Sequence, residues 1–136
     1  MKNIELALMG YVAWTLLLLL MLVGRRSFLT ISGKKAANTF STDGEDLGGF
    51  DQRLVRAQAN CVENLPIFAS IALYCIFKQY HAITDKFALV LLAARIGQST
   101  VHMISTRTLA VYARFTFFVI QLAIMLEWLW CIFSVK

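Results

Sequence analysis

The amino-acid sequence predicts an all-α membrane protein, built as a bundle of four antiparallel transmembrane helices. Two observations favour this fold class. First, 59% of the 136 residues are hydrophobic and only 15% are charged, whereas soluble domains have about 45–50% apolar and about 25% charged residues. Second, four segments reach the roughly 17–25 largely apolar residues that a transmembrane helix needs. We therefore expect residues 1–136 to form a single transmembrane domain.

The first predicted helix covers residues 4–23, with the sequence IELALMGYVAWTLLLLLMLV. Lys2 precedes this run, as a basic residue does in a secretory signal peptide. However, the apolar region of a signal peptide is about 7–15 residues long, and this run has about 20. The segment that follows, GRRSF, contains no small-residue cleavage motif. We therefore predict a retained transmembrane helix.

The other three predicted helices are joined by short connections. The second covers about residues 52–77 and is polar in its first half and apolar in its second. The third covers about residues 86–103, and the fourth covers about residues 109–133. The connections at 78–85 and 104–108 are short, as is typical of antiparallel neighbours in a helix bundle.

Residues 24–51 are predicted to form one long polar loop. Cytoplasmic loops of membrane proteins carry an excess of lysine and arginine. The side of the long loop has six such residues, namely Arg25, Arg26, Lys34, Lys35, Arg53 and Arg107. The opposite side has four, namely Lys2, Lys78, Lys86 and Lys136. This bias predicts that the long loop is cytoplasmic and that both termini lie outside.

Polar side chains form a stripe along the second predicted helix. The stripe consists of Arg53, Arg56, Asn60 and Glu63. Successive members are three, four and three residues apart, so they share one helical face. Ionisable residues inside a membrane are costly, and their default interpretation is functional. The stripe is therefore a candidate site.

A second stripe lies on the third predicted helix, where Arg95, Gln98 and His102 are spaced by three and then four residues. At 1.5 Å per residue, Arg95 lies about 12 Å from the cytoplasmic end of its helix, and Arg114 lies about 7 Å from the same side. Arg26 ends the first helix on this side. These groups therefore converge on one level of the bundle.

A structural alternative is that the charges of the stripes neutralise one another. Glu63 could pair with Arg56 or with Arg95 and fix the helix packing. Glu63 is, however, the only acid in the cytoplasmic half of any predicted helix. One carboxylate cannot neutralise Arg56, Arg95 and Arg114. The excess positive charge predicts an anionic ligand or a lipid head group.

Glutathione is an anion that suits these residues. Arginine side chains bind carboxylates well, and Glu63 would bind the ammonium group. A further arginine near the sulfur would favour the thiolate, which is the nucleophilic form. An apolar flank open to lipid would admit a lipophilic electrophile. The protein would then need no nucleophile of its own, because its work would be charge stabilisation and orientation.

Several other classes of site are not expected. No basic run with interleaved aromatic residues is present, so we expect no nucleic-acid partner. Cys61, Cys75 and Cys131 fit no metal motif and are interpreted as small hydrophobic residues, so we expect no metal. A proton-coupled transporter with Glu63 and His102 as relays is the least favoured function, because paired acids and broken-helix repeats are absent from the sequence.

The stretch RAQANCVENLPIF resembles the second-helix signature of the MAPEG superfamily, the membrane-associated proteins of eicosanoid and glutathione metabolism. The signature residues here are Arg56, Asn60, Glu63 and Pro66. GRRSF resembles the paired arginines that end the first helix, and AARIGQSTVH, with Arg95, resembles the third-helix pattern. Within the superfamily, the sequence is similar to the leukotriene C synthases and microsomal glutathione transferases over nearly the whole chain.

The resemblance implies a homotrimer that binds glutathione as co-substrate between subunits, in the cytoplasmic half of the membrane. We expect a multi-pass protein of a bacterial inner membrane. The glutathione-binding residues that the resemblance implies are Arg56, Gln58, Asn60 and Glu63, with Arg95 helping from the third helix. Gln98 and His102, on the same helical face as Arg95, are further candidates for this site. The arginine that activates the thiolate would be Arg114, with Arg26 and then Arg107 as alternatives.

The sequence also departs from the pattern of the leukotriene C synthases. Asn64 stands where they have a tyrosine, and Gln98 and His102 stand where they have two more. These departures keep a second function open. It is a non-catalytic MAPEG-fold membrane protein that binds an anionic lipid or a protein partner.

Overall fold

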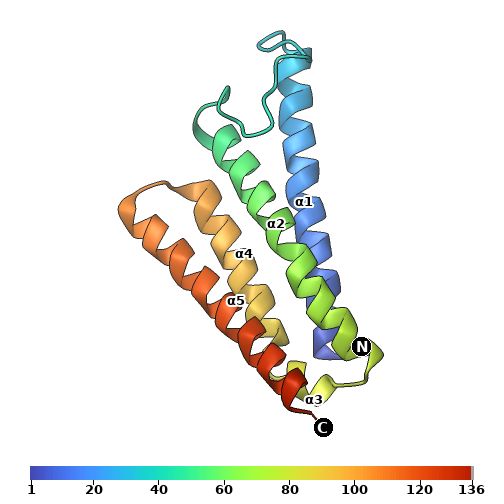
Figure 1. The fold of residues 1–136 in the computed structure, drawn as a ribbon. Coiled ribbons are helices and arrows are strands. Elements are labelled where there is room, and N and C mark those ends of the chain that lie inside the picture. Colours follow the sequence, from blue (N-terminus) through green and yellow to red (C-terminus); the bar gives the residue numbers. More distant parts are fainter. Residues whose placement is uncertain (136) are drawn as a thin grey trace.

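The computed structural model describes residues 1–135 and contains four long helices that run up and down the molecule (Figure 1). The helices are α1 (Asn3–Ile31), α2 (Gly49–Phe77), the short α3 (His81–Thr84), α4 (Ala88–Ile104) and α5 (Thr108–Ser134). Both termini and α3 lie at one end of the bundle, here called the termini end. The α1–α2 and α4–α5 connections lie at the opposite end, here called the loop end. Residues 1–135 contain no strand.

The four long helices are not equivalent in their packing. α4 contacts α1, α2 and α5, and α1 packs along α2. α5 packs chiefly against α4 and touches α2 only slightly. Polar residues of α4 therefore face α1 and α2 on one side and α5 on the other.

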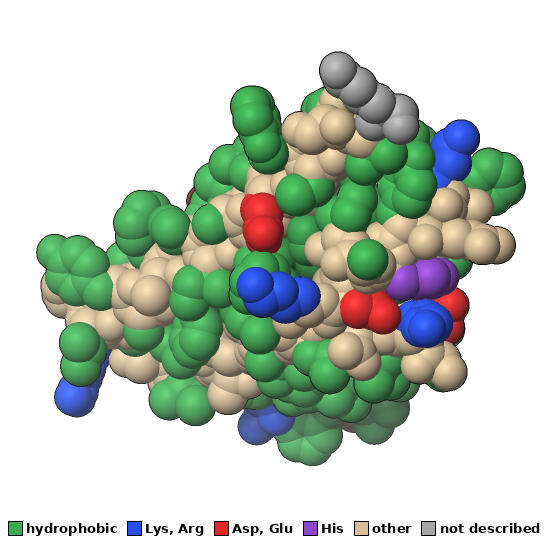
Figure 2. Space-filling model, turned by 90° about the horizontal axis from the view of Figure 1, so that it is seen from below, with side chains coloured by type: hydrophobic (Ala, Val, Ile, Leu, Met, Phe, Trp, Pro, Cys, Tyr) green, Lys and Arg blue, Asp and Glu red, His purple; other side chains and the backbone are tan. Residues whose placement is uncertain are grey.

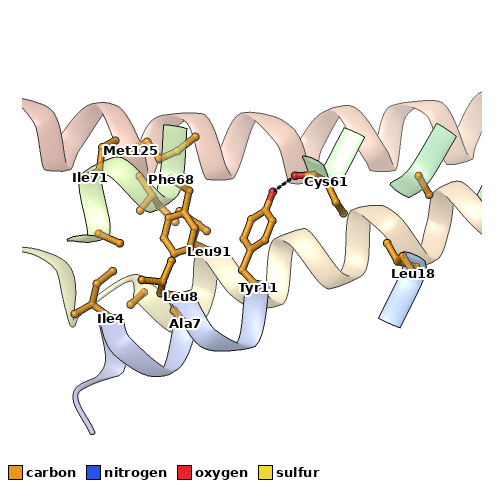
Figure 3. Packing of buried hydrophobic residues seen from close by; sticks show 14 of the residues in the cluster. Ile4, Ala7, Leu8, Tyr11, Leu18, Cys61, Phe68, Ile71, Leu91 and Met125 are labelled. Carbon is orange, nitrogen blue, oxygen red and sulfur yellow. Dashed lines mark hydrogen bonds between the residues drawn. The ribbon is translucent and has the colours of Figure 1, made fainter. Parts of the chain in front are cut away.

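The core of the bundle is aromatic toward the termini end. The ring of Tyr11 stacks on Phe68 with the centroids 5.3 Å apart, and Phe68 lies 6.4 Å from Trp128. Figure 3 shows Tyr11 and Phe68 among smaller aliphatic side chains, with the Tyr11 hydroxyl donating a hydrogen bond to the carbonyl of Cys61. Large rings bury much apolar surface, so this cluster joins α1, α2 and α5.

The outer surface of the bundle is largely apolar. α1, α2 and α5 are each long and apolar enough to cross a membrane, and α4 is a shorter apolar helix of 17 residues. Large side chains such as Leu20, Phe115 and Leu126 are exposed, as expected for surfaces that face lipid. The all-α, four-helix membrane fold predicted from the sequence is therefore confirmed.

Polar contacts tie the helices together at the termini end. The backbone N–H of Ile4 donates to Oδ1 of Asp85 over 3.0 Å, which satisfies a donor that the first turn of α1 leaves unpaired. The side chain of Asn3 donates to the carbonyl of the same aspartate. Figure 2 shows this end, where charged side chains are few and lie among hydrophobic ones.

The first helix is longer than the sequence predicts. We expected it to end at Val23, but α1 continues to Ile31, and the connection to α2 covers only residues 32–48. Hydropathy marks where a membrane span ends, whereas arginine and leucine continue a helix readily in water. The helix ends where Gly33 adopts a φ of +70°, a left-handed conformation typical of helix C-termini.

Candidate functional site

Three members of the predicted α2 stripe line one cavity at the loop end. This cavity, here called the α2–loop cavity, has a volume of about 280 Å³. Its polar lining consists of Arg56, Asn60 and Glu63 from α2, His102 from α4, and Asp43 and Glu45 from the α1–α2 connection. The fourth member of the stripe points elsewhere, because Nε of Arg53 donates to the carbonyl of Met103 over 2.7 Å. Arg53 thus satisfies a carbonyl in the last turn of α4.

A second cavity of about 280 Å³, here called the α4–α5 cavity, adjoins the first. Its lining includes Asn60, Gln98, His102 and Arg114 together with three apolar side chains of α5, Val111, Phe115 and Phe118. Asn60 and His102 line both cavities. The structure therefore brings together six of the residues that the sequence singles out, namely Arg56, Asn60, Glu63, Gln98, His102 and Arg114.

Arg95 lies inside the bundle and lines neither cavity. Its side chain is 1% exposed, and Nη1 donates to Oδ1 of Asn60 over 2.7 Å. Its guanidinium lies 5.3 Å from the centroid of the Tyr11 ring, within the range of a cation–π contact. Arg95 thus touches a cavity residue rather than the cavity space. Its geometry suits a residue that positions Asn60.

Gln98 and Gln121 form a buried amide pair between α4 and α5. Nε2 of Gln121 donates to Oε1 of Gln98 and to the carbonyl of Phe117, both over 2.9 Å. Gln121 is not among the site residues predicted from the sequence, although a lone amide in the apolar run of the fourth helix is itself a signal. The pair fixes the side chain of Gln98 at the edge of the α4–α5 cavity.

The remaining predicted site residues lie outside both cavities. Arg26 lines a separate cavity of about 530 Å³, where Nη2 donates to the carbonyl of Ser41 over 3.0 Å. Gln58 is half-buried and lines neither the α2–loop nor the α4–α5 cavity. Arg107 is exposed in the α4–α5 connection. Within one chain, Arg114 is therefore the arginine that adjoins Asn60 and His102 across the α4–α5 cavity.

The charge balance of the site differs from the one expected from the helices alone. The carboxylates of Asp43 and Glu45 come from the connection and face the same cavity as Arg56. Neither Arg56 nor Arg95 forms an ion pair with Glu63, since the ion pairs among residues 1–135 are Arg25–Asp51 and Lys35–Asp46. The pairing considered as a structural alternative is therefore not formed.

Residues 1–135 contain no group of histidine, cysteine and acidic side chains that could hold a metal ion.

Contacts to Asp46 join separate parts of the α1–α2 connection to one another. Nζ of Lys35 lies 2.9 Å from Oδ2 of Asp46, and the hydroxyl of Ser41 donates to Oδ1 of the same carboxylate. The hydrogen bond from Ser41, followed by that from Lys35, holds the pKa of Asp46 well below its usual range. A depressed carboxyl pKa stabilises the folded connection above the unfolded pKa of about 3.9, and this stability is lost as the pH falls through the folded pKa.

We expect Asp46→Asn to increase hydrogen–deuterium exchange in residues 32–48 at pH 7. The variant keeps the shape of the side chain but loses the charge that both partners stabilise. The difference from the wild type should persist down to about pH 4 and close only at lower pH, where Asp46 of the wild type becomes protonated. Glu127→Gln, at an exposed position on α5, is the control. Equal exchange in Asp46→Asn and the wild type at pH 7 would contradict this account.

Comparison with known proteins gives one result that covers nearly the whole chain. Residues 4–134 match the model of the MAPEG family. A search of curated proteins and a search of solved structures found no match. The match agrees with the helical architecture, with the apolar helices and with the α2 motif that lines the α2–loop cavity. The chain is thus a membrane protein related in general to glutathione and eicosanoid metabolism, and it belongs to the MAPEG family.

Proposed function

We propose that the protein is a glutathione-dependent membrane transferase or peroxidase. The observation that carries this proposal is the meeting of two unlike cavities at Asn60 and His102. One cavity offers charged groups for the ends of a peptide, and the other offers Arg114 beside aromatic rings. Together the two volumes fall within the roughly 300–1,000 Å³ that small-molecule sites occupy.

The α2–loop cavity suits the peptide part of glutathione. The planar guanidinium of Arg56 can bind a carboxylate through two parallel hydrogen bonds. The carboxylate of Glu63, on the same face of α2, is a partner for the ammonium group. Asn60 lies between them along the helix, and its oxygen already accepts the hydrogen bond from Arg95. Its amide N–H groups can therefore donate to the ligand.

The α4–α5 cavity suits the thiol and its reaction. A free cysteine thiol has a pKa of about 8.5, so little thiolate is present at pH 7. Lowering this pKa by one unit requires about 1.4 kcal/mol of preferential stabilisation of the thiolate. Arg114 can supply it because a guanidinium stays charged at every physiological pH. His102, at the boundary of the two cavities, can donate a further hydrogen bond.

The aromatic side of the α4–α5 cavity suits a lipophilic electrophile. Phe115 is exposed on the outer face of α5, and Phe118 is half-buried beside it. An apolar molecule dissolved in the membrane could reach the thiolate along this face. With a chlorinated nitroaromatic, the sulfur would bond to the ring carbon and chloride would leave with the bonding electron pair.

Assembly and location form part of the same proposal. The protein would act as a homotrimer in a bacterial inner membrane, with the two cavities at the boundaries between subunits, so that a neighbouring subunit would cover the glutathione bound in them on the cytoplasmic side. Exposed apolar side chains on α1 and α5 are compatible both with lipid and with subunit contacts. The loop end, which carries both cavities, would face the cytoplasm. There, glutathione is available.

An anionic lipid head group is the alternative ligand. It would need a site with net positive charge. The α2–loop cavity contains the carboxylates of Asp43, Glu45 and Glu63 against the single guanidinium of Arg56. Such a lining repels a phosphate that carries no ammonium group more strongly than it repels glutathione, whose ammonium group offsets one of its two carboxylates. It therefore supports the peptide over an anionic lipid.

The proposal is tested with the purified protein in detergent. We expect saturable binding of glutathione in calorimetry and conjugation of 1-chloro-2,4-dinitrobenzene or reduction of a lipid hydroperoxide. No binding at millimolar glutathione would refute the proposal. Co-purifying anionic lipid together with an absence of thiol chemistry would favour the alternative.

We expect Arg56→Ala to weaken glutathione binding by roughly tenfold to a hundredfold. Hydrogen bonds to charged groups contribute about 1.5–3 kcal/mol, and each 1.4 kcal/mol corresponds to a tenfold change in affinity. Calorimetric titration measures the change. Arg107→Ala, which removes an exposed cation at the same end of the bundle, is the matched control. If a stably folded Arg56→Ala variant keeps the wild-type affinity, Arg56 does not belong to the binding site.

A further inference from the structure

The amide group of Gln98, at the edge of the α4–α5 cavity, is held in one orientation from its buried side. Gln121 of α5 lies on that side; it is 1% exposed and does not line the cavity. Nε2 of Gln121 donates to the carbonyl of Phe117 and to the side chain of Gln98, each over 2.9 Å. Both N–H groups of this nitrogen are therefore used.

The carbonyl of Phe117 determines which way the two amides point. A backbone carbonyl only accepts hydrogen bonds, so the atom of Gln121 that faces it must be the amide nitrogen. The same nitrogen also faces Gln98, so Gln98 must present its oxygen to Gln121. The amide nitrogen of Gln98 is then directed away from Gln121. Turning Gln98 over would bring two donors together at a buried position, which is costly.

Close packing of α4 on α5 keeps the two amides at this distance. A Cβ atom at Gly97 would lie 2.9 Å from Cζ of Phe117, so the aromatic ring rests directly on the backbone of α4. Gly97 precedes Gln98, and Phe117 lies about one helical turn before Gln121. The same contact therefore sets the spacing of the amide pair.

The amide nitrogen of Gln98 is the part of this side chain that is left for a ligand. Within residues 1–135, no group accepts a hydrogen bond from Nε2 of Gln98. This nitrogen is not sealed inside the bundle, unlike Nε of Arg95, which is buried without a partner. Gln98 thus offers free N–H donors to the α4–α5 cavity that it lines.

The surroundings of Gln98 indicate the kind of group that these donors meet. The cavity is also lined by apolar side chains of α5, such as Phe115 and Phe118, where the proposed function places the electrophile. The permanent charge of Arg114 is assigned to the thiolate. A neutral, preorganised donor suits an atom that gains charge only as the new bond forms, because the donor need not move at that moment.

We propose that Gln121 is a positioning residue, which holds the N–H groups of Gln98 toward an oxygen of the electrophile that gains negative charge when the thiolate attacks. The inference rests on the proposed function and assigns Gln98 to the electrophile rather than to the peptide. With 1-chloro-2,4-dinitrobenzene, the sulfur bonds to the carbon that bears chlorine, and an electron pair of the ring moves onto a nitro oxygen. The pair returns to the ring as chloride leaves with the electrons of its own bond.

The test compares two chlorides that differ in where charge develops. Benzyl chloride also gives a thioether and chloride, but its chloride leaves as the carbon–sulfur bond forms, and no oxygen gains charge. Gln121→Met replaces the amide by an unbranched side chain of similar length. We expect it to lower kcat/KM for 1-chloro-2,4-dinitrobenzene about threefold to tenfold, as for one neutral hydrogen bond, and that for benzyl chloride by less than about twofold.

Thr116→Val is the matched control on the same helix. Oγ1 of Thr116 also donates to a carbonyl four residues earlier, that of Tyr112, over 2.9 Å. Thr116 lines neither the α2–loop nor the α4–α5 cavity. This variant should keep the wild-type kcat/KM for both chlorides.

A double-variant cycle tests whether Gln121 acts through Gln98. Gln98→Met should cause a selective loss at least as large as that of Gln121→Met. Adding Gln121→Met to Gln98→Met should then cause no further loss, because the donor that Gln121 positions is already gone. This cycle requires the nitroaromatic chloride alone.

Two results would overturn the inference and leave the proposed function standing. One is an equal loss with both chlorides in Gln121→Met, and the other is additive losses in the double variant. An equal loss together with weaker thiolate absorbance would show that Gln98 acts on the sulfur instead. A wild type that conjugates neither chloride also overturns the inference, and the proposed function fails with it if the protein binds no glutathione.

Discussion

Replacement of Arg114 by alanine is expected to slow conjugation at pH 7 by about tenfold to a hundredfold, with little change in glutathione affinity or thermal stability. Arg114 adjoins Asn60 and His102 across the α4–α5 cavity and lies outside the α2–loop cavity. If it lowers the thiol pKa by about two units, its loss leaves only a few per cent of thiolate at pH 7. The peptide ends would still be held by Arg56 and Glu63.

The loss of rate in Arg114→Ala should depend on pH in a defined direction. Solvent supplies thiolate without help from the protein as the pH rises toward the free thiol pKa of about 8.5. The rate deficit of Arg114→Ala should therefore shrink with rising pH. Arg26→Ala, in a separate cavity, and Arg107→Ala should keep the wild-type rate and pH profile. A full rate in Arg114→Ala and a loss in either control would assign the role to another arginine.

Replacement of Arg95 by alanine is expected to lower the free energy of unfolding by about 2–4 kcal/mol. The substitution leaves a cavity in the core and leaves the Oδ1 atom of Asn60 without its donor. Relief of a buried charge that has no carboxylate partner offsets part of this loss. Thermal denaturation in detergent should show a melting temperature several degrees lower than that of the wild type.

The variant Arg95→Met distinguishes the effect of Arg95 on core packing from its effect on the position of the Asn60 side chain. Methionine refills much of the volume without the charge, so we expect stability closer to that of the wild type. Asn60 would still lose the hydrogen bond that fixes it, so KM for glutathione should rise. Arg53→Met is the matched control, since Arg53 bonds a backbone carbonyl outside both cavities. An unchanged KM in Arg95→Met would show that Asn60 needs no positioning by Arg95.

Apolar patterning was sufficient to predict the fold class, because a membrane imposes span lengths that hydropathy reveals directly. The spacing of the stripe on α2 also predicted which residues share a face, and Arg56, Asn60 and Glu63 line one cavity. The end of α1 could not be found this way, because hydropathy changes at Val23 although the helix continues to Ile31. The end of a helix and the end of a membrane span are therefore determined by different physical effects.

The acidic side chains that the connection brings to the α2–loop cavity could not be predicted from the spacing of polar residues along the helices. Asp43 and Glu45 reach the cavity through a connection whose path depends on Gly44 and on contacts to Asp46. Such a path is set by tertiary contacts rather than by a periodic pattern. The burial of Arg95 could not be predicted either, because its spacing fits the α4 stripe. Its position inside the bundle depends on tertiary contacts with Tyr11 and Asn60.

The ultraviolet difference absorbance of glutathione bound to the wild-type protein tests the central claim most directly. Thiolate absorbs where the thiol does not, so stabilisation by Arg114 predicts a saturable absorbance increase on titration with glutathione at pH 7. S-methylglutathione, which cannot ionise at sulfur, should bind without this signal. The increase should reach a plateau at the same glutathione concentration as calorimetric binding. Saturable binding of glutathione with no thiolate absorbance would contradict the claim that the protein activates the thiol.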